Sequence, residues 1–72
     1  MVTIRFKLSE AEPVRLELDR PVELEKVLPR AAALANVELG GYIAIRNGEV
    51  ITSAGTVGPD DVIEVFPALS GG

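Results

Sequence analysis

The sequence contains neither cysteine nor histidine. The lack of cysteine excludes disulfides and thiolate nucleophiles, and the lack of histidine removes the commonest metal ligand and general base of proteins. The serines Ser9, Ser53 and Ser70 therefore have no histidine to activate them, and no hydrolase or transferase site can be assembled from the other residues. We expect no catalytic residue, no metal and no bound cofactor.

Long apolar runs and clusters of basic residues are also missing. No run approaches the ~20 apolar residues that a membrane-spanning helix needs, and residues 1–5 lead directly into a strand pattern rather than a signal peptide. We therefore expect a cytoplasmic protein without membrane contact. The net charge is -4, with acidic and basic residues interspersed. Direct binding of nucleic acid, which needs a clustered basic face, is not expected, whereas an acidic domain favours a basic docking surface on a protein partner.

The size and composition indicate one globular domain. The chain has 72 residues, of which 47% are hydrophobic and 25% charged. A chain this short buries only about 60% of the surface that its unfolded form exposes, so it builds a single small core. Little room remains for a deep catalytic cavity.

The first half of the chain predicts a strand hairpin and then a helix. Apolar and polar residues alternate over residues 2–8 and again over residues 14–19, and a short turn between them predicts an antiparallel hairpin. From Glu23 the apolar residues recur at helical spacing. Pro29 predicts a kink or an irregular first turn in this helix, which is expected to end near Asn36.

The second half predicts three further strands. Residues 42–46 and 49–52 flank Asn47-Gly48, the strongest short-range signal for a hairpin, because a type I′ turn needs positive φ at both positions. Residues 53–57 are expected to form a loop, and residues 58–61 a type I turn. The adjacent carboxylates of that turn are explained by the turn itself rather than by a metal site. The last strand is predicted over residues 62–66.

This order of elements predicts an α+β domain in which a single helix packs across one mixed five-stranded sheet. A last strand that lies parallel to the first, in the middle of the sheet, gives the β-grasp fold, and an open sheet with another strand order is the alternative. Residues 1–66 are expected to form the domain and residues 67–72 a flexible C-terminal tail. The predicted core between sheet and helix comprises Ile4, Phe6, Leu16, Leu34, Ile45, Ile63 and Val65.

The tail carries the clearest candidate for chemistry. Because glycine has no Cβ, Gly71 and Gly72 can thread a narrow channel, with Ser70 behind them. An unhindered carboxylate on Gly72 would be easily reached by the α-phosphate of ATP. We therefore predict Gly72 as a covalent carrier site and Ser70 and Gly71 as the segment that threads into a partner's active site. The alternative is an ordinary frayed end.

A docking surface is predicted beside this tail. Phe66 lies on the strand face opposite Ile63 and Val65, so it points away from the helix if those two residues point towards it. An exposed aromatic residue near Pro67 and Leu69 is a candidate anchor for a partner protein. The alternative is that Phe66 packs against a sheet edge or a loop.

Residues 60–72 resemble the end of the ThiS/MoaD family of ubiquitin-like sulfur carrier proteins, which typically finish with an acidic turn, an apolar strand, often Phe-Pro, and Gly-Gly. Residues 43–50 are similar to the central hairpin of the family, and the order of elements agrees over essentially the whole chain. The resemblance implies a β-grasp fold. It also implies that the chain is not an enzyme but the substrate of one.

In that family a ubiquitin-activating-type enzyme adenylates the C-terminal glycine, which is Gly72 here, and a sulfur donor converts the adenylate to a thiocarboxylate (1-thioglycine). The implied acceptor is the large subunit of molybdopterin synthase, favoured by Phe66-Pro67, or thiazole synthase in thiamine biosynthesis, favoured by the short chain. A tRNA thiolase is the third candidate, favoured by residues 69–72. Two other functions stay open: a protein modifier joined through Gly72 to target lysines, and a non-covalent interaction module.

Overall fold

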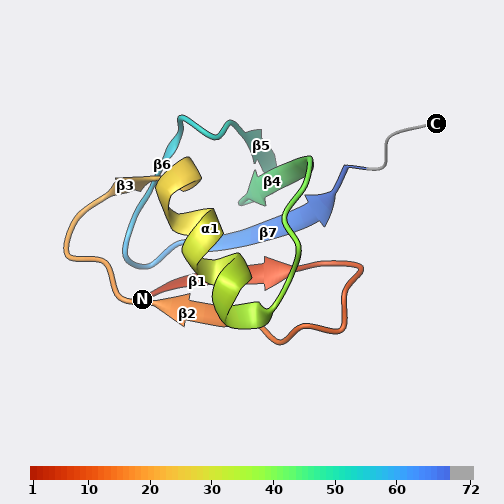
Figure 1. Ribbon diagram of the computed structural model, residues 1–72. Helices are drawn as coiled ribbons and strands as arrows, with labels where there is room; N and C mark the ends of the chain where they lie inside the picture. Colours follow the sequence, from red (N-terminus) through yellow and green to blue (C-terminus); the bar gives the residue numbers. More distant parts are fainter. Residues whose placement is uncertain (69–72) are drawn as a thin grey trace.

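A mixed sheet of five strands forms one layer of the computed structural model, which describes residues 1–68 (Figure 1). In the order β2-β1-β7-β4-β5, the strands are Val14–Leu16, Val2–Phe6, Val62–Pro67, Tyr42–Arg46 and Glu49–Ile51. β1 and β7 are parallel, and every other neighbouring pair in this sheet is antiparallel. The last strand thus lies beside the first in the middle of the sheet, which confirms the predicted α+β architecture with its β-grasp arrangement and excludes the alternative strand order.

One helix, α1 (Leu24–Ala35), crosses one face of the sheet. It is continuous through Pro29, whose side chain is exposed. The helix ends as predicted at Asn36, which takes the left-handed conformation with φ 56° and ψ 42°. The N–H of Val37 then donates to the carbonyl of Ala32 at 2.8 Å, a bond that satisfies one of the free carbonyls of the last turn.

A two-stranded sheet at the start of the helix was not predicted from the sequence. Its strands are β3 (Val22–Glu23) and β6 (Thr56–Val57), and residues 53–57 were expected to be a loop. This region caps the helix by backbone contacts: the N–H of Leu24 donates to Gly55 O at 2.8 Å and that of Glu25 to Ser53 O at 2.9 Å. These bonds replace a side-chain cap, which Glu23 does not supply.

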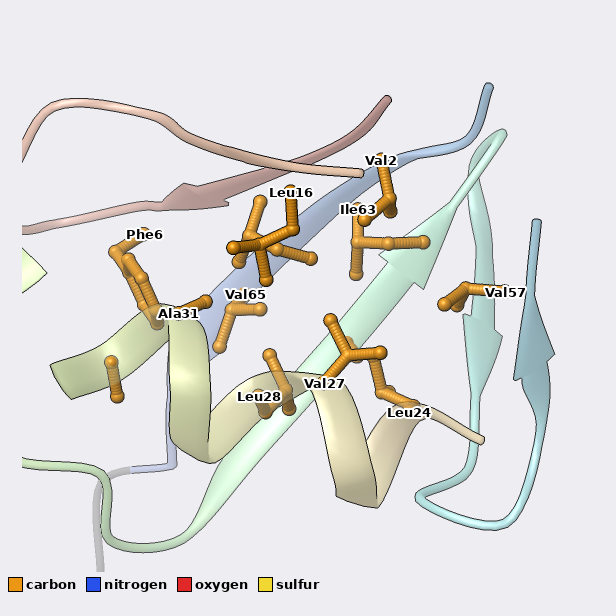
Figure 2. Packing of buried hydrophobic residues seen from close by; sticks show 13 residues of the cluster. Val2, Phe6, Leu16, Leu24, Val27, Leu28, Ala31, Val57, Ile63 and Val65 are labelled. Carbon is orange, nitrogen blue, oxygen red and sulfur yellow. The ribbon is translucent and has the colours of Figure 1, made fainter. Parts of the chain in front are cut away.

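The core lies between α1 and the sheet (Figure 2). It confirms five of the predicted positions, and Val57 of β6 is a fully buried addition. The buried residues are Val2, Ile4, Phe6, Leu16, Leu24, Val27, Leu28, Ala31, Ala32, Ala44, Val57, Ile63 and Val65.

Two residues that were predicted to lie in the core, Leu34 and Ile45, do not lie there. Leu34 is 68% exposed, because the buried stripe of the helix runs through Val27, Leu28 and Ala31 and leaves Leu34 on the outer side. Ile45 lies on the opposite sheet face, because its neighbour Ala44, 1% exposed, is the β4 residue that points towards the helix. The smaller of two adjacent apolar residues occupies the core here.

Both predicted turns in the second half are confirmed. Asn47 and Gly48 have φ 53° and 81°, as a type I′ turn requires. The turn at residues 58–61 is closed by a hydrogen bond from the N–H of Asp61 to Gly58 O at 3.2 Å.

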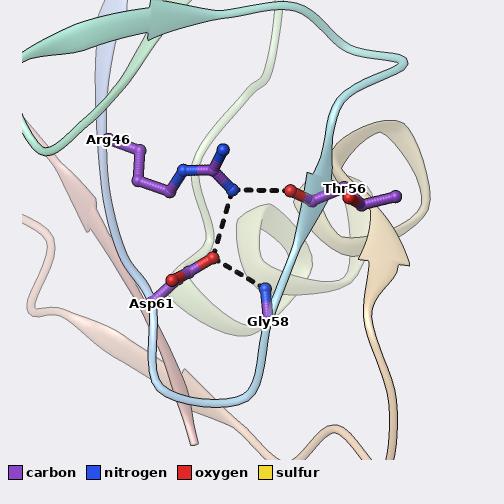
Figure 3. A network of polar contacts seen from close by, with 4 residues as sticks. All are labelled: Arg46, Thr56, Gly58 and Asp61. Atoms are coloured by element: carbon purple, nitrogen blue, oxygen red, sulfur yellow. Dashed lines mark hydrogen bonds and ion pairs between the residues drawn. The ribbon is translucent and has the colours of Figure 1, made fainter.

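Asp61 also ties this turn to the central hairpin (Figure 3). Its Oδ2 accepts from the N–H of Gly58 at 2.7 Å and lies 3.2 Å from Nη1 of Arg46. The same Nη1 donates to the carbonyl of Thr56 at 2.6 Å. Asp61 therefore has a structural partner on each side, and within residues 1–68 no group of carboxylates is arranged to hold a metal ion.

Candidate functional site

The sheet has a second face that α1 does not cover. In β7, Ile63 and Val65 are buried against the helix, and the alternating residues Val62, Glu64 and Phe66 point to the other side. The predicted orientation of Phe66 follows from this alternation. Its side chain is half-buried, and its register partner on the neighbouring strand β4 is Ile43.

Phe66 belongs to a group of apolar residues on this open face, which we call the open-face patch: Ile43, Ile45, Val50 and Phe66. Ile43 stands opposite Phe66, and Ile45 stands opposite Val50, so the patch extends from β7 across β4 to the edge strand β5. Val50 is 69% exposed and Ile43 46%. Directly opposed residues of adjacent strands have Cβ atoms about 4.5–5.5 Å apart, so the side chains form a contiguous surface. Contiguous exposed apolar surface of this kind is a candidate site for association with another protein.

Sequence reasoning identified Phe66 but missed its neighbours. The signal was present, because a two-residue Asn47-Gly48 turn fixes the pairing of the residues that flank it. Arg46 is thereby paired with Glu49, and Ile45 with Val50 on one face. The hairpin alone does not show which of its two faces points away from the helix, since both faces carry apolar residues.

The patch lies near the strand end that leads to the glycines. β7 runs to Pro67, and the N–H of Ala68 donates to Gly41 O at 2.9 Å, so the chain remains tied to the sheet through Ala68. The predicted residues Leu69, Ser70, Gly71 and Gly72 lie outside the described part of the chain.

Pro67 and Phe66 point to opposite faces of the sheet, so the structure does not bring these two predicted docking residues together. Pro67 lines a cavity of about 180 Å³ on the helix side, together with Phe6, Leu8 and Tyr42. Leu8 is 79% exposed and has φ 59°, an uncommon conformation for a bulky residue. The end of the molecule from which the tail leaves therefore has an apolar surface on both sides of the sheet.

Basic side chains occupy the other half of the open face. Arg5 alternates with the buried residues of β1, and Arg15 alternates with those of β2, so both point to the side of Phe66. Lys7 follows β1, and its Nζ lies 3.5 Å from Oε2 of Glu64. The open face is thus apolar over β4 and β5 and positively charged over β1 and β2.

Comparison of the sequence with protein-family models and with curated proteins finds no significant match. Evidence for the function therefore comes from the motifs of the chain and the geometry of the sheet. In the part of the chain that the structure describes, no helix is both long and apolar enough to cross a membrane.

Proposed function

We propose that this chain is a sulfur carrier protein. The observation that carries the proposal is the position of Phe66 opposite Ile43 on the open face, at the end of the strand that leads to Gly71-Gly72. An apolar docking surface next to an unhindered glycine end suits a protein that is held by an enzyme while its tail enters the active site. The resemblance of residues 60–72 to the sulfur carriers gives the chemistry.

The chemical steps of the proposed cycle use no side chain of this protein. A carboxylate oxygen of Gly72 attacks the α-phosphorus of ATP, pyrophosphate leaves, and an acyl-adenylate forms. A sulfur nucleophile at the oxidation level of sulfide then attacks the acyl carbon, AMP leaves, and the product is the thiocarboxylate of Gly72. The proposal requires that Gly72 carries the terminal carboxylate in the working protein.

The docking role is assigned to the open-face patch, with Phe66 as its aromatic anchor. Anchors of protein interfaces are typically aromatic residues surrounded by weaker contacts that exclude water. Ile43 on the neighbouring strand β4 supplies such a contact, and Val50 lies one strand further away, on β5. Leu69, which lies between the patch and the glycines in the sequence, would continue the contact towards the active site.

Three pathways are candidates, and they differ in the enzyme that accepts the sulfur. Phe66-Pro67 favours the large subunit of molybdopterin synthase, the short chain favours thiazole synthase, and the ending at residues 69–72 favours a tRNA thiolase. Incubation of the thiocarboxylate form with each purified acceptor from the host, followed by measurement of the loss of sulfur from Gly72, distinguishes them.

The proposal is tested by reconstitution. The chain is incubated with the adenylating enzyme of its host, ATP and hydrosulfide, and its intact mass is measured. We expect a gain equal to the difference between one sulfur and one oxygen atom, dependent on ATP and absent from a chain that lacks Gly72. Adenylation of the chain without Gly72 would refute the proposal. Covalent adducts between Gly72 and lysines of other proteins would instead indicate a protein modifier.

A further inference from the structure

We infer that the partner surface that binds the open face is apolar opposite β4 and β5 and acidic opposite β1 and β2. The inference deepens the proposed function. It rests on that function, because the function identifies the adenylating enzyme as the first partner to be tested. It reverses the expectation from the sequence, because an acidic chain favours a basic partner only if its acidic residues lie on the docking surface. Here they do not.

The two arginines that define the charged half lie close together on adjacent strands. Arg15 is the register partner of Thr3, and Arg5 follows Thr3 by two residues on the same face. Such diagonal neighbours in an antiparallel pair are about 7–8 Å apart. Both side chains are exposed. Among residues 1–68, neither arginine takes part in an ion pair.

Within the strands, negative charge on this face is limited to one side chain; beyond the strand ends, Glu17 follows Arg15 by two residues on the same alternation. Across the five strands that the structure describes, Glu64 is the sole carboxylate on the open face, and it is paired with Lys7 at 3.5 Å. Arg5 of β1 is the register partner of Glu64 on β7, so two cations, Arg5 and Lys7, flank this carboxylate. The local charge of the face is therefore positive although the chain as a whole has a net charge of -4.

A protein with carboxylates suits this surface better than a nucleic acid does. Half of the open face is apolar, and the phosphate backbone of a nucleic acid offers nothing to cover Ile43 or Val50. Binding of nucleic acid also depends on many phosphate contacts, and this face provides two unpaired cations. Carboxylates at the rim of a protein interface would instead steer the approach of Arg5 and Arg15 while the apolar half provides affinity.

The experiment measures the association rate of the chain with the adenylating enzyme of its host at low and high salt. The test variant is R5E/R15E. The control, R20E/R30E, changes the net charge equally at two exposed arginines on the helix side of the molecule. Because Glu at position 5 would face Glu64 and could disturb the sheet, the neutral variant R5Q/R15Q is measured as well, and circular dichroism verifies the fold of all four proteins.

We expect R5E/R15E to associate about tenfold more slowly at low salt, R5Q/R15Q to be intermediate, and R20E/R30E to be close to the wild type. The difference should shrink at high salt, where the Debye length falls to about 3 Å at 1 M. An unchanged or faster association of R5E/R15E would overturn the inference. A single-stranded RNA oligonucleotide bound by the wild type and not by R5E/R15E would also overturn it, in favour of a nucleic-acid ligand.

Failure of the proposed function is separated from failure of this inference by a second arm. If the adenylating enzyme does not bind the wild type, the same proteins are used as baits in host lysate and the captured proteins are quantified. A protein captured by the wild type and by R20E/R30E is identified and purified, and it supports the inference only if it associates more slowly with R5E/R15E at low salt and the difference shrinks at high salt. Equal capture by R5E/R15E, or no capture by any bait, overturns it.

Discussion

Phe66 and Ile43 are register partners on β7 and β4, on the sheet face that the helix leaves uncovered. The pair lies near the point where the chain leaves the sheet, because the last described backbone hydrogen bond joins Ala68 to Gly41. This relationship connects the fold to the proposed function: the same strand that fills the core with Ile63 and Val65 carries Phe66 on the open face and precedes the glycines in the sequence.

Replacement of Phe66 by alanine should separate docking from folding. Phe66 is half-buried on the open face and does not belong to the core. We expect a nearly unchanged melting temperature and a loss of at least about 2 kcal/mol in binding of the adenylating enzyme, or roughly thirtyfold in Kd. Calorimetric melting and titration on the same preparation measure both. A large fall in melting temperature with unaltered Kd would show that Phe66 is structural and that the partner binds elsewhere.

Replacement of Phe6 by alanine should have the opposite effect. Phe6 is 6% exposed at the end of β1, and truncation of a buried phenylalanine costs about 3–5 kcal/mol. That is a large share of the stability of a small domain, so the variant should be partly unfolded without denaturant. L34A is the control, because Leu34 is exposed on the outer side of the helix and should lose little stability. A loss below about 1 kcal/mol for F6A in urea unfolding would contradict the strand orientation.

Replacement of Asp61 by alanine should loosen the turn before β7. The variant loses the acceptor for the N–H of Gly58 and the ion pair with Arg46. We expect a loss of about 1–2 kcal/mol in the free energy of unfolding, since hydrogen bonds to charged groups are worth somewhat more than neutral ones. D60A is the matched control, because the Asp60 carboxylate is fully exposed and should contribute little. Equal urea midpoints for the two variants would refute the structural role of Asp61.

Replacement of Gly71 by alanine should affect loading and not folding. A Cβ at this position restricts the backbone angles and widens the segment that has to enter an active site. The expected result is an unchanged melting temperature and slower formation of the acyl-adenylate, measured as ATP–pyrophosphate exchange with the adenylating enzyme. S70A is the control. Ser70 is one residue further than Gly71 from the reacting carboxylate of Gly72, and its replacement by alanine adds no bulk. Equal exchange rates for G71A and the wild type would show that no narrow channel surrounds Gly71.

Much of the fold could be predicted because its signals are local. Alternation defined β1 and β2, and Asn47-Gly48 defined the hairpin of β4 and β5, with positive φ at both residues as expected. The two-residue strands β3 and β6 could not be predicted, since two residues carry no periodicity and their pairing joins segments far apart in the sequence. The carbonyls of Ser53 and Gly55, in the segment just before β6, accept hydrogen bonds from the first N–H groups of the helix, which has no side-chain cap.

The two errors in the core have different physical origins. Leu34 lies outside the buried stripe of the helix, whereas for β4 sequence reasoning assigned the larger residue, Ile45, to the interior instead of its neighbour Ala44. The helix instead packs over the small residue, and the large one becomes part of the open-face patch. For the candidate site, the orientation of Phe66 followed from the period of the strand, whereas its contacts with β4 and the charge of the face depend on strand order. The sequence showed the charge balance of the chain and not its distribution over the two faces.

The most direct test of the account is the intact mass of the protein purified from its own host under conditions that preserve thiocarboxylates. The account predicts a population that is heavier than the unmodified chain by the difference between one sulfur and one oxygen atom, with fragmentation that assigns the change to Gly72 as the terminal residue. A chain without Gly72, expressed in the same host, should lack this population. A wild-type protein that carries only the unmodified carboxylate, or that continues beyond Gly72, would contradict the central claim.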